Sequence, residues 1–335
     1  MVTISDIATA LGVTPSTVSR ALSGSPRVKE ETRLAVEKKA AEMGYERNVV
    51  ASNLRKGRSD IVGIIVPRIH REFFSNVIGG AESILEAAGY SVLICQTHER
   101  FDAEVKALLT LRNNQVAGVL ISHAIGSDTG DHILEALGDR IPLVQFDRVF
   151  SELPGAKVVS NNFGGAYEAT RHLVEQGYRR IGTLAGYMNS EAYAARLEGY
   201  RQALRDCGIA PDDSIVYYDT IVRETGFEGG LKALEAGCDA LYCAGDFCAL
   251  GAIQAVQSKG LRIPEDFGVV GTANESFTAL MTPTMSSLAL NPFEMGRQAA
   301  QAFLSGEGET VVVPMELKVR DSSTRNKQQN HSEYV

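Results

Sequence analysis

Residues 5–22 read SDIATALGVTPSTVSRAL, and this stretch decides how the N-terminal part of the chain folds. Ser5 can cap a short helix whose apolar residues recur on one face, and Gly12 ends that helix. Thr14 is a good N-cap for a second helix, because Pro15 suits the first helical position, where no N–H is needed. Two short helices joined by a glycine-containing turn are typical of a helix-turn-helix, whose second helix enters the DNA major groove.

The second helix, Pro15 to Leu22, presents one face to the core and one to solvent. Val18, Ala21 and Leu22 would face the core. The expected base-reading residues are therefore those on the other face, Pro15, Ser16, Ser19 and Arg20. Arg20 is the best of these, because a guanidinium can pair with two guanine acceptors, worth ~1–3 kcal/mol of discrimination. A third helix, roughly 30–43 and ended by Gly44, would complete the unit; the alternative for residues 1–44 is another small helical bundle.

Charge divides the chain unevenly. The 335 residues carry a formal net charge of −8, yet residues 1–59 hold ten Lys and Arg against six Asp and Glu. The head is therefore basic and the remainder acidic. This asymmetry is expected when a DNA-binding module is joined to a sensing or enzymatic domain, because phosphate contacts need local positive charge.

Other features exclude several classes of protein. The apolar run Ile61–Val66 is six residues long, far below the ~20 that a membrane helix needs. The N-terminus lacks the pattern of a secretory signal, so we expect a cytoplasmic protein. Five cysteines, an odd number without CxxC spacing, fit a reducing compartment.

Motifs of enzymes and cofactor sites are missing from the sequence. It contains no GxGxxG, no GxxxxGK[ST], no GxSxG elbow and no HExxH pair. Cys238, Cys243 and Cys248 are spaced by five residues, which does not fit common zinc patterns. We therefore expect no cofactor, no metal and no catalytic residue.

From Ile61 onward, short apolar runs alternate with helix-length segments, which is typical of parallel α/β sheets. The expected strands are Ile61–Val66, Ser91–Cys95, Ala117–Ser122, Pro142–Phe146, Val158–Ser160, Ile181–Ala185, Ala240–Cys243 and Gly268–Gly271. Expected helices between them include Phe74–Ala88, Ala103–Asn113, Gly164–Gln176 and Glu191–Cys207. The pattern alone allows one barrel, one Rossmann sheet or two lobes.

Three segments of the head closely resemble the lactose-repressor (LacI/GalR) family of bacterial transcription factors. They are VTISDIA at residues 2–8, GVTPSTVSRAL at 12–22, and the spaced residues from Gly44-Tyr45 to Gly57-Arg58-Ser59. The resemblance implies a hinge that folds on the operator, with Ala51 touching the minor groove and Leu54 wedged between base pairs. The alternative for Leu54 is packing on its own domain. Arg47 and Ser52 depart from the family pattern of proline and arginine.

The same resemblance implies a set of phosphate contacts, which position a protein on DNA without specifying sequence. They would be made by Thr14, Thr17, Ser19, Arg27, Thr32, Tyr45 and Asn48.

The resemblance continues through the body to about residue 324. Its landmarks include Phe146-Asp147-Arg148, Arg196-(x2)-Gly199-Tyr200 and Gly245-Asp246. It implies an all-α helix-turn-helix head plus an α/β, two-lobed effector domain of the periplasmic-binding-protein-like type I, with crossovers near Asn161 and Leu290. Glu72 to Ser75 and Ala273 to Glu275 look most like the Bacteroidetes branch.

The expected boundaries follow from this architecture. The head is 1–46, the hinge 47–59, the effector and dimerisation domain 60–325, and the disordered tail 326–335. Within the domain, the N-terminal lobe would take about 60–161 and 291–310, and the C-terminal lobe about 162–290 and 311–325.

Ligands of open α/β sheets bind beyond the carboxyl ends of the strands, so loops at those ends should line the cleft between the lobes. The expected effector-binding residues are His70, Phe73, Phe74, Asp147, Arg148, Tyr193, Arg196, Asp246, Phe247 and Asn274. The resemblance implies that Arg196 and Asp246 hydrogen-bond the effector; the alternative is an ion pair between them. Phe73 and Phe74 have the alternative of anchoring the first helix of the lobe. Asn274 stands where many relatives carry aspartate.

The sequence thus predicts a homodimeric transcriptional regulator, a repressor, that binds a pseudo-palindromic operator in double-stranded DNA. Its effector would be a sugar or a sugar derivative. The alternative is a cytoplasmic α/β small-molecule-binding protein or metabolic enzyme with a basic helical appendage.

Overall fold

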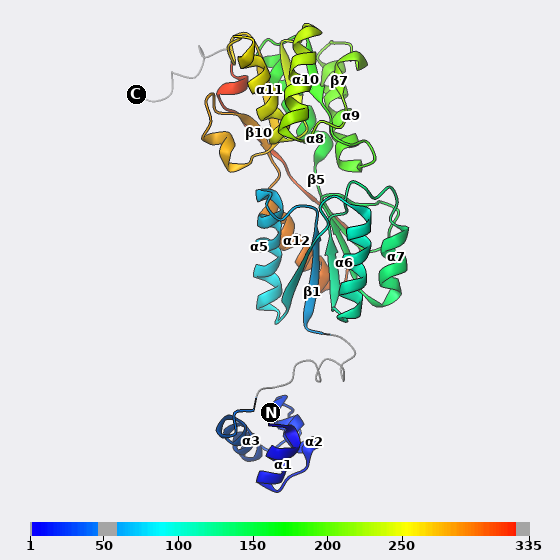
Figure 1. Ribbon diagram of the computed structural model, residues 1–335, viewed down its shortest axis with the longest axis vertical. Helices are drawn as coiled ribbons and strands as arrows, with labels where there is room; N and C mark the ends of the chain where they lie inside the picture. Colours follow the sequence, from blue (N-terminus) through cyan, green and yellow to red (C-terminus); the bar gives the residue numbers. More distant parts are fainter. Residues whose placement is uncertain (1, 46–58, 326–335) are drawn as a thin grey trace, which may run out of the picture. The chain divides into compact units, whose positions relative to one another are not determined.

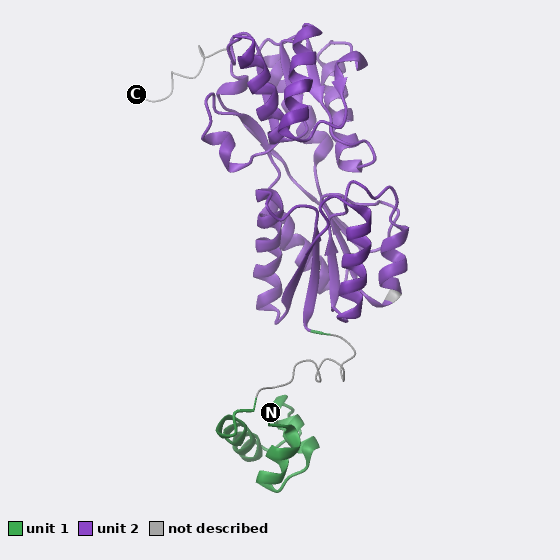
Figure 2. Ribbon diagram, in the orientation of Figure 1, with its two compact units in different colours: residues 1–59 green, residues 60–335 purple. Residues whose placement is uncertain are grey.

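The computed structural model describes residues 2–45 and 59–325, and the chain divides into two compact units between Ser59 and Asp60 (Figure 2). Within residues 2–45, the first unit contains three helices, α1 (Ile4–Leu11), α2 (Pro15–Leu22) and α3 (Glu30–Glu42). Their buried residues form one small core: Ile7, Ala8, Val18, Ala21, Val36 and Ala40. The helix-turn-helix head predicted from the sequence is confirmed.

The first helix begins earlier than predicted. Thr3, not Ser5, is its N-cap: the Thr3 hydroxyl accepts from the Asp6 N–H at 3.3 Å, and the Asp6 carboxylate accepts from the Thr3 N–H at 2.8 Å. This reciprocal capping box satisfies two backbone donors, which a cap at Ser5 could not do. Gly12 ends the helix at φ 66°, a conformation that glycine adopts without steric cost.

The second unit consists of two lobes, each a six-stranded sheet covered by helices on both faces (Figure 1). We call them the N-lobe and the C-lobe. The N-lobe contains β1 (Ile61–Val66), β2 (Ser91–Gln96), β3 (Gly118–Ile121), β4 (Leu143–Phe146), β5 (Ala156–Ser160), β11 (Thr310–Val313), α5 (Glu72–Ala87), α6 (Phe101–Asn113), α7 (Asp131–Leu137) and α12 (Pro292–Ser305). The C-lobe contains β6 (Ile181–Leu184), β7 (Val216–Tyr217), β8 (Ala240–Cys243), β9 (Gly268–Ala273), β10 (Ser286–Ala289), β12 (Glu316–Lys318), α8 (Asn162–Glu175), α9 (Glu191–Asp206), α10 (Arg223–Glu235) and α11 (Asp246–Ser258).

The sheet orders are β11-β5-β4-β3-β1-β2 in the N-lobe and β12-β10-β9-β8-β6-β7 in the C-lobe. All pairings are parallel except that of β10 with β12. Alternate residues of β1 explain the layering: Ile64 packs with α5 and α12, whereas Ile65 packs with α6 and α7. Successive side chains of a strand point to opposite faces of the sheet, and helices cover both faces here. Neighbouring residues of β1 therefore pack against different helices.

Within residues 59–325, the chain crosses between the lobes three times. Two crossovers, after β5 at residue 161 and after β10 at residues 290–291, lie where the sequence predicts them. The third crossover was expected between residues 310 and 311. It lies later in the chain, because β11 extends to Val313 and pairs with β5 in the N-lobe. Residues 311–313, which were expected in the C-lobe, therefore belong to the N-lobe, and the chain returns through Pro314 and Met315.

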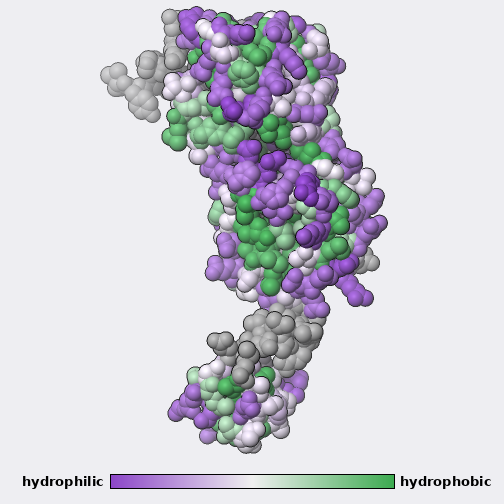
Figure 3. Space-filling view, in the orientation of Figure 1, coloured by the Kyte–Doolittle hydropathy of each residue, from purple (hydrophilic) through white to green (hydrophobic). Residues whose placement is uncertain are grey.

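The surface of the second unit is uneven in polarity. On the face shown in Figure 3, polar residues gather where the lobes meet, and apolar residues lie over the N-lobe between α5 and α6. The edge strand β2 contributes to that region, with Ile94 37% exposed. In the described ranges, no helix is long and apolar enough to cross a membrane. All five cysteines are free thiols.

Candidate functional site

The second helix of the head presents polar side chains to solvent. Thr14 caps α2 by accepting from the Thr17 N–H at 3.2 Å, and its hydroxyl also lies 2.8 Å from the Ser16 hydroxyl. Pro15, Ser16 and Arg20 are exposed, and Ser19 is half-buried. Within residues 2–45 the Arg20 guanidinium has no ion pair or hydrogen-bond partner. Arg20 is therefore free to reach a base edge.

The predicted phosphate contacts have different surroundings. Arg27 and Thr14 are exposed, and Thr17 and Thr32 are half-buried. Tyr45 packs partly against the core of the head. Asn48, Ala51 and Leu54 lie outside the described residues, so the hinge stays a prediction from the sequence.

A cavity of about 110 Å³ lies between the N-lobe and the C-lobe, and we call it the cleft. Eight of the ten predicted effector-binding residues line it: Phe73, Phe74, Asp147, Arg148, Tyr193, Arg196, Asp246 and Phe247. Strand ends bring them together, since Asp147 follows β4 and Asp246 follows β8.

Two predicted residues do not line the cleft. His70 is exposed in the turn before α5. The side-chain oxygen of Asn274 accepts from Arg320 at 2.7 Å, and Asn274 lines a neighbouring cavity of about 470 Å³ instead. Arg320 follows β12, so only the tertiary fold could reveal that this amide is already occupied.

Phe73 and Phe74 lie in both of the places that the sequence left open, the core of the N-lobe and the wall of the cleft. Both rings are buried in the N-lobe core beside α12, and both line the cleft. Their ring centres lie 5.0 Å apart in an edge-to-face arrangement. They anchor α5 and give the cleft an apolar wall.

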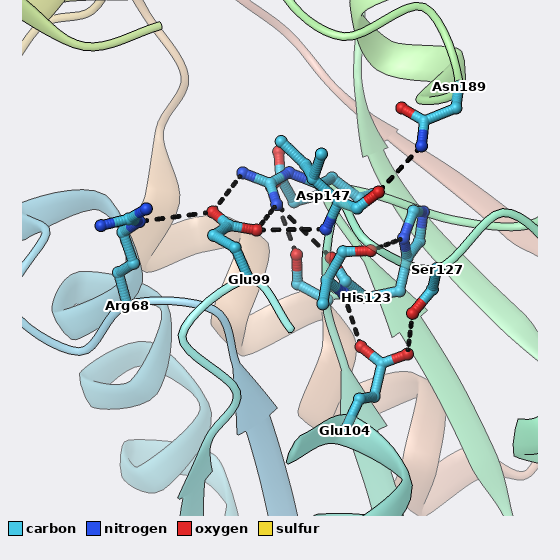
Figure 4. A network of polar contacts seen from close by, with 11 residues as sticks. Arg68, Glu99, Glu104, His123, Ser127, Asp147 and Asn189 are labelled. Carbon is cyan, nitrogen blue, oxygen red and sulfur yellow. Dashed lines mark hydrogen bonds and ion pairs between the residues drawn. The ribbon is translucent and has the colours of Figure 1, made fainter. Parts of the chain in front are cut away.

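Glu99, which the sequence analysis missed, organises the N-lobe side of the cleft (Figure 4). Its carboxylate accepts from Arg148 at 2.7 and 3.3 Å, from the Ile125 N–H at 3.1 Å, and lies 3.5 Å from Arg68. These partners come from the loops after β1, β3 and β4. Burial raises the pKa of Glu99, but Arg148, the Ile125 N–H and Arg68 together outweigh that effect, so the pKa lies below its ordinary value.

Asp147 is a carboxylate with few partners. It adopts φ 61°, and its nearest donors are the Ser122 hydroxyl at 3.4 Å and Arg148 Nε at 3.9 Å. Burial raises its pKa, while Arg148 and Arg196 oppose that rise. A strained backbone that holds a nearly unpartnered acceptor in a cavity is typical of a ligand-binding position.

The loop after β3 is fixed from below by a second carboxylate (Figure 4). Glu104 on α6 is fully buried and accepts from the Ser127 hydroxyl at 2.9 Å and from His132 Nε2 at 2.7 Å. His123 in the same loop stacks on Phe150, with ring centres 4.0 Å apart. Burial lowers the pKa of His123, so the ring is neutral at physiological pH.

The C-lobe side of the cleft has its own charged groups. Arg196 donates to the Asn162 side-chain oxygen at 2.8 Å and to the Ala244 carbonyl at 2.9 Å. Asp246 accepts from the Ser287 hydroxyl at 2.6 Å and from the Glu275 N–H at 2.8 Å. Gly271 is needed beside it, because a Cβ there would lie 2.2 Å from Asp246 Oδ1.

The alternative of an ion pair between Arg196 and Asp246 is wrong. Among the described residues, Arg196 bonds only neutral acceptors, and Asp246 bonds a hydroxyl and a backbone N–H. Burial raises the pKa of Asp246 to about 7, although Ser287 and the Glu275 N–H oppose that rise. Each group keeps unused hydrogen-bonding capacity for a ligand.

Direct contacts join the two lobes on both sides of the cleft. Near α5, Arg71 lies over the Phe247 ring at 3.6 Å, and the Glu72 carboxylate accepts from the Ser276 N–H at 2.8 Å. At the loop after β3, the Asn189 amide donates to the Ile125 carbonyl at 2.8 Å (Figure 4). The cleft can therefore change shape only if these contacts rearrange.

The cleft combines charged groups with apolar rings. In the portion of the chain that the structure describes, no cluster of His, Cys, Asp or Glu could hold a metal ion. The paired guanidinium and carboxylate groups offer many donors and acceptors, and the Phe rings offer apolar surface, which together suit a polyhydroxylated ligand.

Comparison with known proteins bears on both units. A model of bacterial regulatory proteins of the lacI family matches residues 3–48, and a model of a periplasmic binding protein-like domain matches residues 170–323. The chain is 33% identical to the HTH-type transcriptional repressor CytR of Escherichia coli strain K12, over 89% of this chain and 87% of that protein.

Solved structures of transcriptional regulators are also similar to this chain. A lac repressor dimer bound to operator and the anti-inducer ONPF matches with a TM-score of 0.84 and 25% identity, over 96% of this chain and 99% of that one. A complex of the transcriptional regulator CelR with cellobiose matches with a TM-score of 0.73 and 28% identity, over 96% of this chain and 100% of that one.

Proposed function

This chain belongs to the lacI family of bacterial regulatory proteins, and from this premise we propose that it is a repressor whose operator binding is controlled by a sugar held in the cleft. The observation that carries the proposal is the cleft itself. Polar groups converge there from both lobes, with Asp147 and Arg196 holding unused hydrogen-bonding capacity.

Operator recognition rests on α2. Its exposed face offers Pro15, Ser16, Ser19 and Arg20 to base edges, whereas Val18 and Ala21 hold the helix on the head. We assign the phosphate contacts to Thr14, Thr17, Arg27, Thr32, Tyr45 and Asn48, and the minor-groove contacts to Ala51 and Leu54. A single head buries too little DNA surface for tight binding, so the protein acts as a homodimer on a pseudo-palindromic operator.

Effector recognition rests on both walls of the cleft. Asp147 from the N-lobe accepts ligand hydroxyl protons, and Arg196 and Asp246 from the C-lobe donate and accept on the other side. Phe73, Phe74 and Phe247 cover the apolar face of the sugar ring, with Tyr193 and Arg148 completing the wall. We do not retain His70 and Asn274 in this set, because neither lines the cleft.

Coupling between the two sites follows from the lobes. A ligand that contacts both lobes changes their relative orientation, and through the hinge this changes how two heads of a dimer meet DNA. We further propose that the protein acts in the cytoplasm, has no catalytic activity, and belongs with the Bacteroidetes branch that Glu72 to Ser75 resembles.

The experiment is selection of duplex DNA from a random pool by the full chain, followed by titration of the selected duplex. We expect a pseudo-palindromic sequence whose affinity falls steeply between low and moderate salt, because bound counterions are released. Recovery of no sequence preference would contradict the operator proposal and would favour the enzyme with a basic appendage.

A further inference from the structure

Arg71 lines the cleft, but the effector contacts proposed above do not include its guanidinium. Arg71 stands at the N-cap of α5, is half-buried, and stacks over the ring of Phe247 from the opposite lobe. Among residues 59–325, no carboxylate oxygen lies within the 4.0 Å of an ion pair to Arg71. Its charge is therefore only loosely balanced by the protein.

The neighbouring cations on the N-lobe wall are better balanced. Arg68 and Arg148 both face Glu99, at 3.5 and 2.7 Å. Asp147, at 3.9 Å from Arg148, is the other carboxylate of this wall. On this wall, Arg71 is therefore the guanidinium without an ion pair to a carboxylate of the described residues.

The C-lobe wall forms no ion pair with Arg71 among the described residues. Its carboxyl groups are Asp246 and Glu275, of which Glu275 is the one whose charge acts on Arg71. Burial raises the pKa of both Asp246 and Glu275, and Glu72 adds to the rise at Glu275. Arg196, also on this wall, bonds only neutral acceptors.

Arg71 is half-buried, so the absence of an ion pair carries a free-energy cost. Burial lowers the pKa of Arg71, while Glu275 opposes that change and Arg68 adds to it. A partly buried cation is unfavourable unless an anion pairs with it. The planar fork of a guanidinium matches a carboxylate or a phosphate in two parallel hydrogen bonds.

From this arrangement we propose that the effector is a sugar derivative carrying a carboxylate or a phosphate, and that Arg71 is the specificity-determining residue that binds the anion. The inference rests on the sugar-binding cleft proposed above and narrows its ligand class. Arg71 of the N-lobe and Arg196 of the C-lobe both line the cleft, so both walls offer it a guanidinium.

The test is titration calorimetry of the full chain with matched sugars that differ in one group. D-Glucose is compared with D-glucuronate and D-glucose 6-phosphate, D-galactose with D-galacturonate, and D-ribose with D-ribose 5-phosphate. We expect at least one anionic member to bind about tenfold or more tightly than its neutral partner. The carboxylate and phosphate arms identify which anion is preferred, and inorganic phosphate alone should not reproduce the affinity.

Two variants assign the effect to its residue. Arg71→Met should bring the anionic and neutral sugars to within about threefold of each other, because the anion loses its guanidinium partner while the hydroxyl contacts to Asp147 and Arg196 remain. Arg171→Met removes the same charge from an exposed position on α8 that does not line the cleft, so the preference should persist.

Each result is decisive. Neutral sugars that bind as tightly as their acids would overturn the inference and leave the proposed function intact. Loss of neutral and anionic binding together in Arg71→Met would show a structural role and also overturn it. Binding of no sugar by a chain that still selects an operator would overturn the sugar effector itself.

Discussion

Glu99→Gln tests whether the cleft is organised as the geometry indicates, because glutamine keeps the size of the side chain and removes its charge. The Glu99 side chain is 13% exposed and that of Arg148 is 7% exposed. Removing one partner of a buried ion pair costs ~3–5 kcal/mol. Asp147 remains near Arg148 and Glu99 keeps some solvent contact, so we expect the low end, about 3 kcal/mol of unfolding free energy.

The assay is urea unfolding of the wild type and the variant, monitored by circular dichroism. Glu198→Gln is the matched control, because Glu198 pairs with Arg205 at the surface, where the two side chains are 50% and 43% exposed. Exposed pairs contribute about 0–1 kcal/mol. A loss in Glu99→Gln no larger than that of the control would refute the organising function of Glu99.

The pH dependence gives a second readout of the same group. The folded-state pKa of Glu99 lies below its ordinary value, since Arg148, the Ile125 N–H and Arg68 together outweigh the effect of burial. Its stabilisation is therefore present above the unfolded pKa of about 4.3 and is lost as the pH falls through the folded-state pKa. The stability difference between wild type and Glu99→Gln should shrink in acid.

Three further predictions concern the other groups. Arg20→Ala should lose ~1–3 kcal/mol on the selected operator and relax one G·C preference per half-site, measured by fluorescence anisotropy; equal losses on random DNA would show a phosphate contact instead. Leu54→Ser should abolish most operator bending in a circular-permutation gel assay while ligand binding persists, and unchanged bending would reject the wedge. The folded-state pKa of Asp246 is about 7, against an ordinary value of 3.8. The stabilisation that protonated Asp246 contributes is therefore fully present below about pH 3.8 and is lost as the pH rises towards 7. Asp246→Asn should therefore flatten the pH dependence of urea unfolding in that window, and an unchanged slope would contradict the shift.

Local rules predicted most elements of the fold from the sequence. Thr14 and Pro15 begin α2 as expected, and the apolar runs of β1 and β8 match the predicted strands. The cleft was predictable because strand ends carry Asp147 and Asp246, and parallel strands bring such ends to one edge.

The remaining features depend on tertiary contacts that no local pattern carries. Glu99 adopts φ 63° just beyond β2, and its partners are up to 49 residues away. Asn274 is occupied by Arg320, 46 residues further along the chain. No strand was predicted at β11, because its pairing with β5 joins residues about 150 apart in sequence.

In the proposed function, binding of a ligand in the cleft and binding of operator by α2 are coupled, so that each changes the affinity for the other. The most direct measurement is the operator dissociation constant with and without a saturating amount of the sugar that binds most tightly by calorimetry. Coupling of ~1–3 kcal/mol predicts a change of about five- to 150-fold, and an equal change in sugar affinity when operator is bound. In a folded Asp147→Ala variant, operator should still bind, but sugar should no longer change the operator dissociation constant. An operator affinity that saturating sugar leaves unchanged would contradict the account.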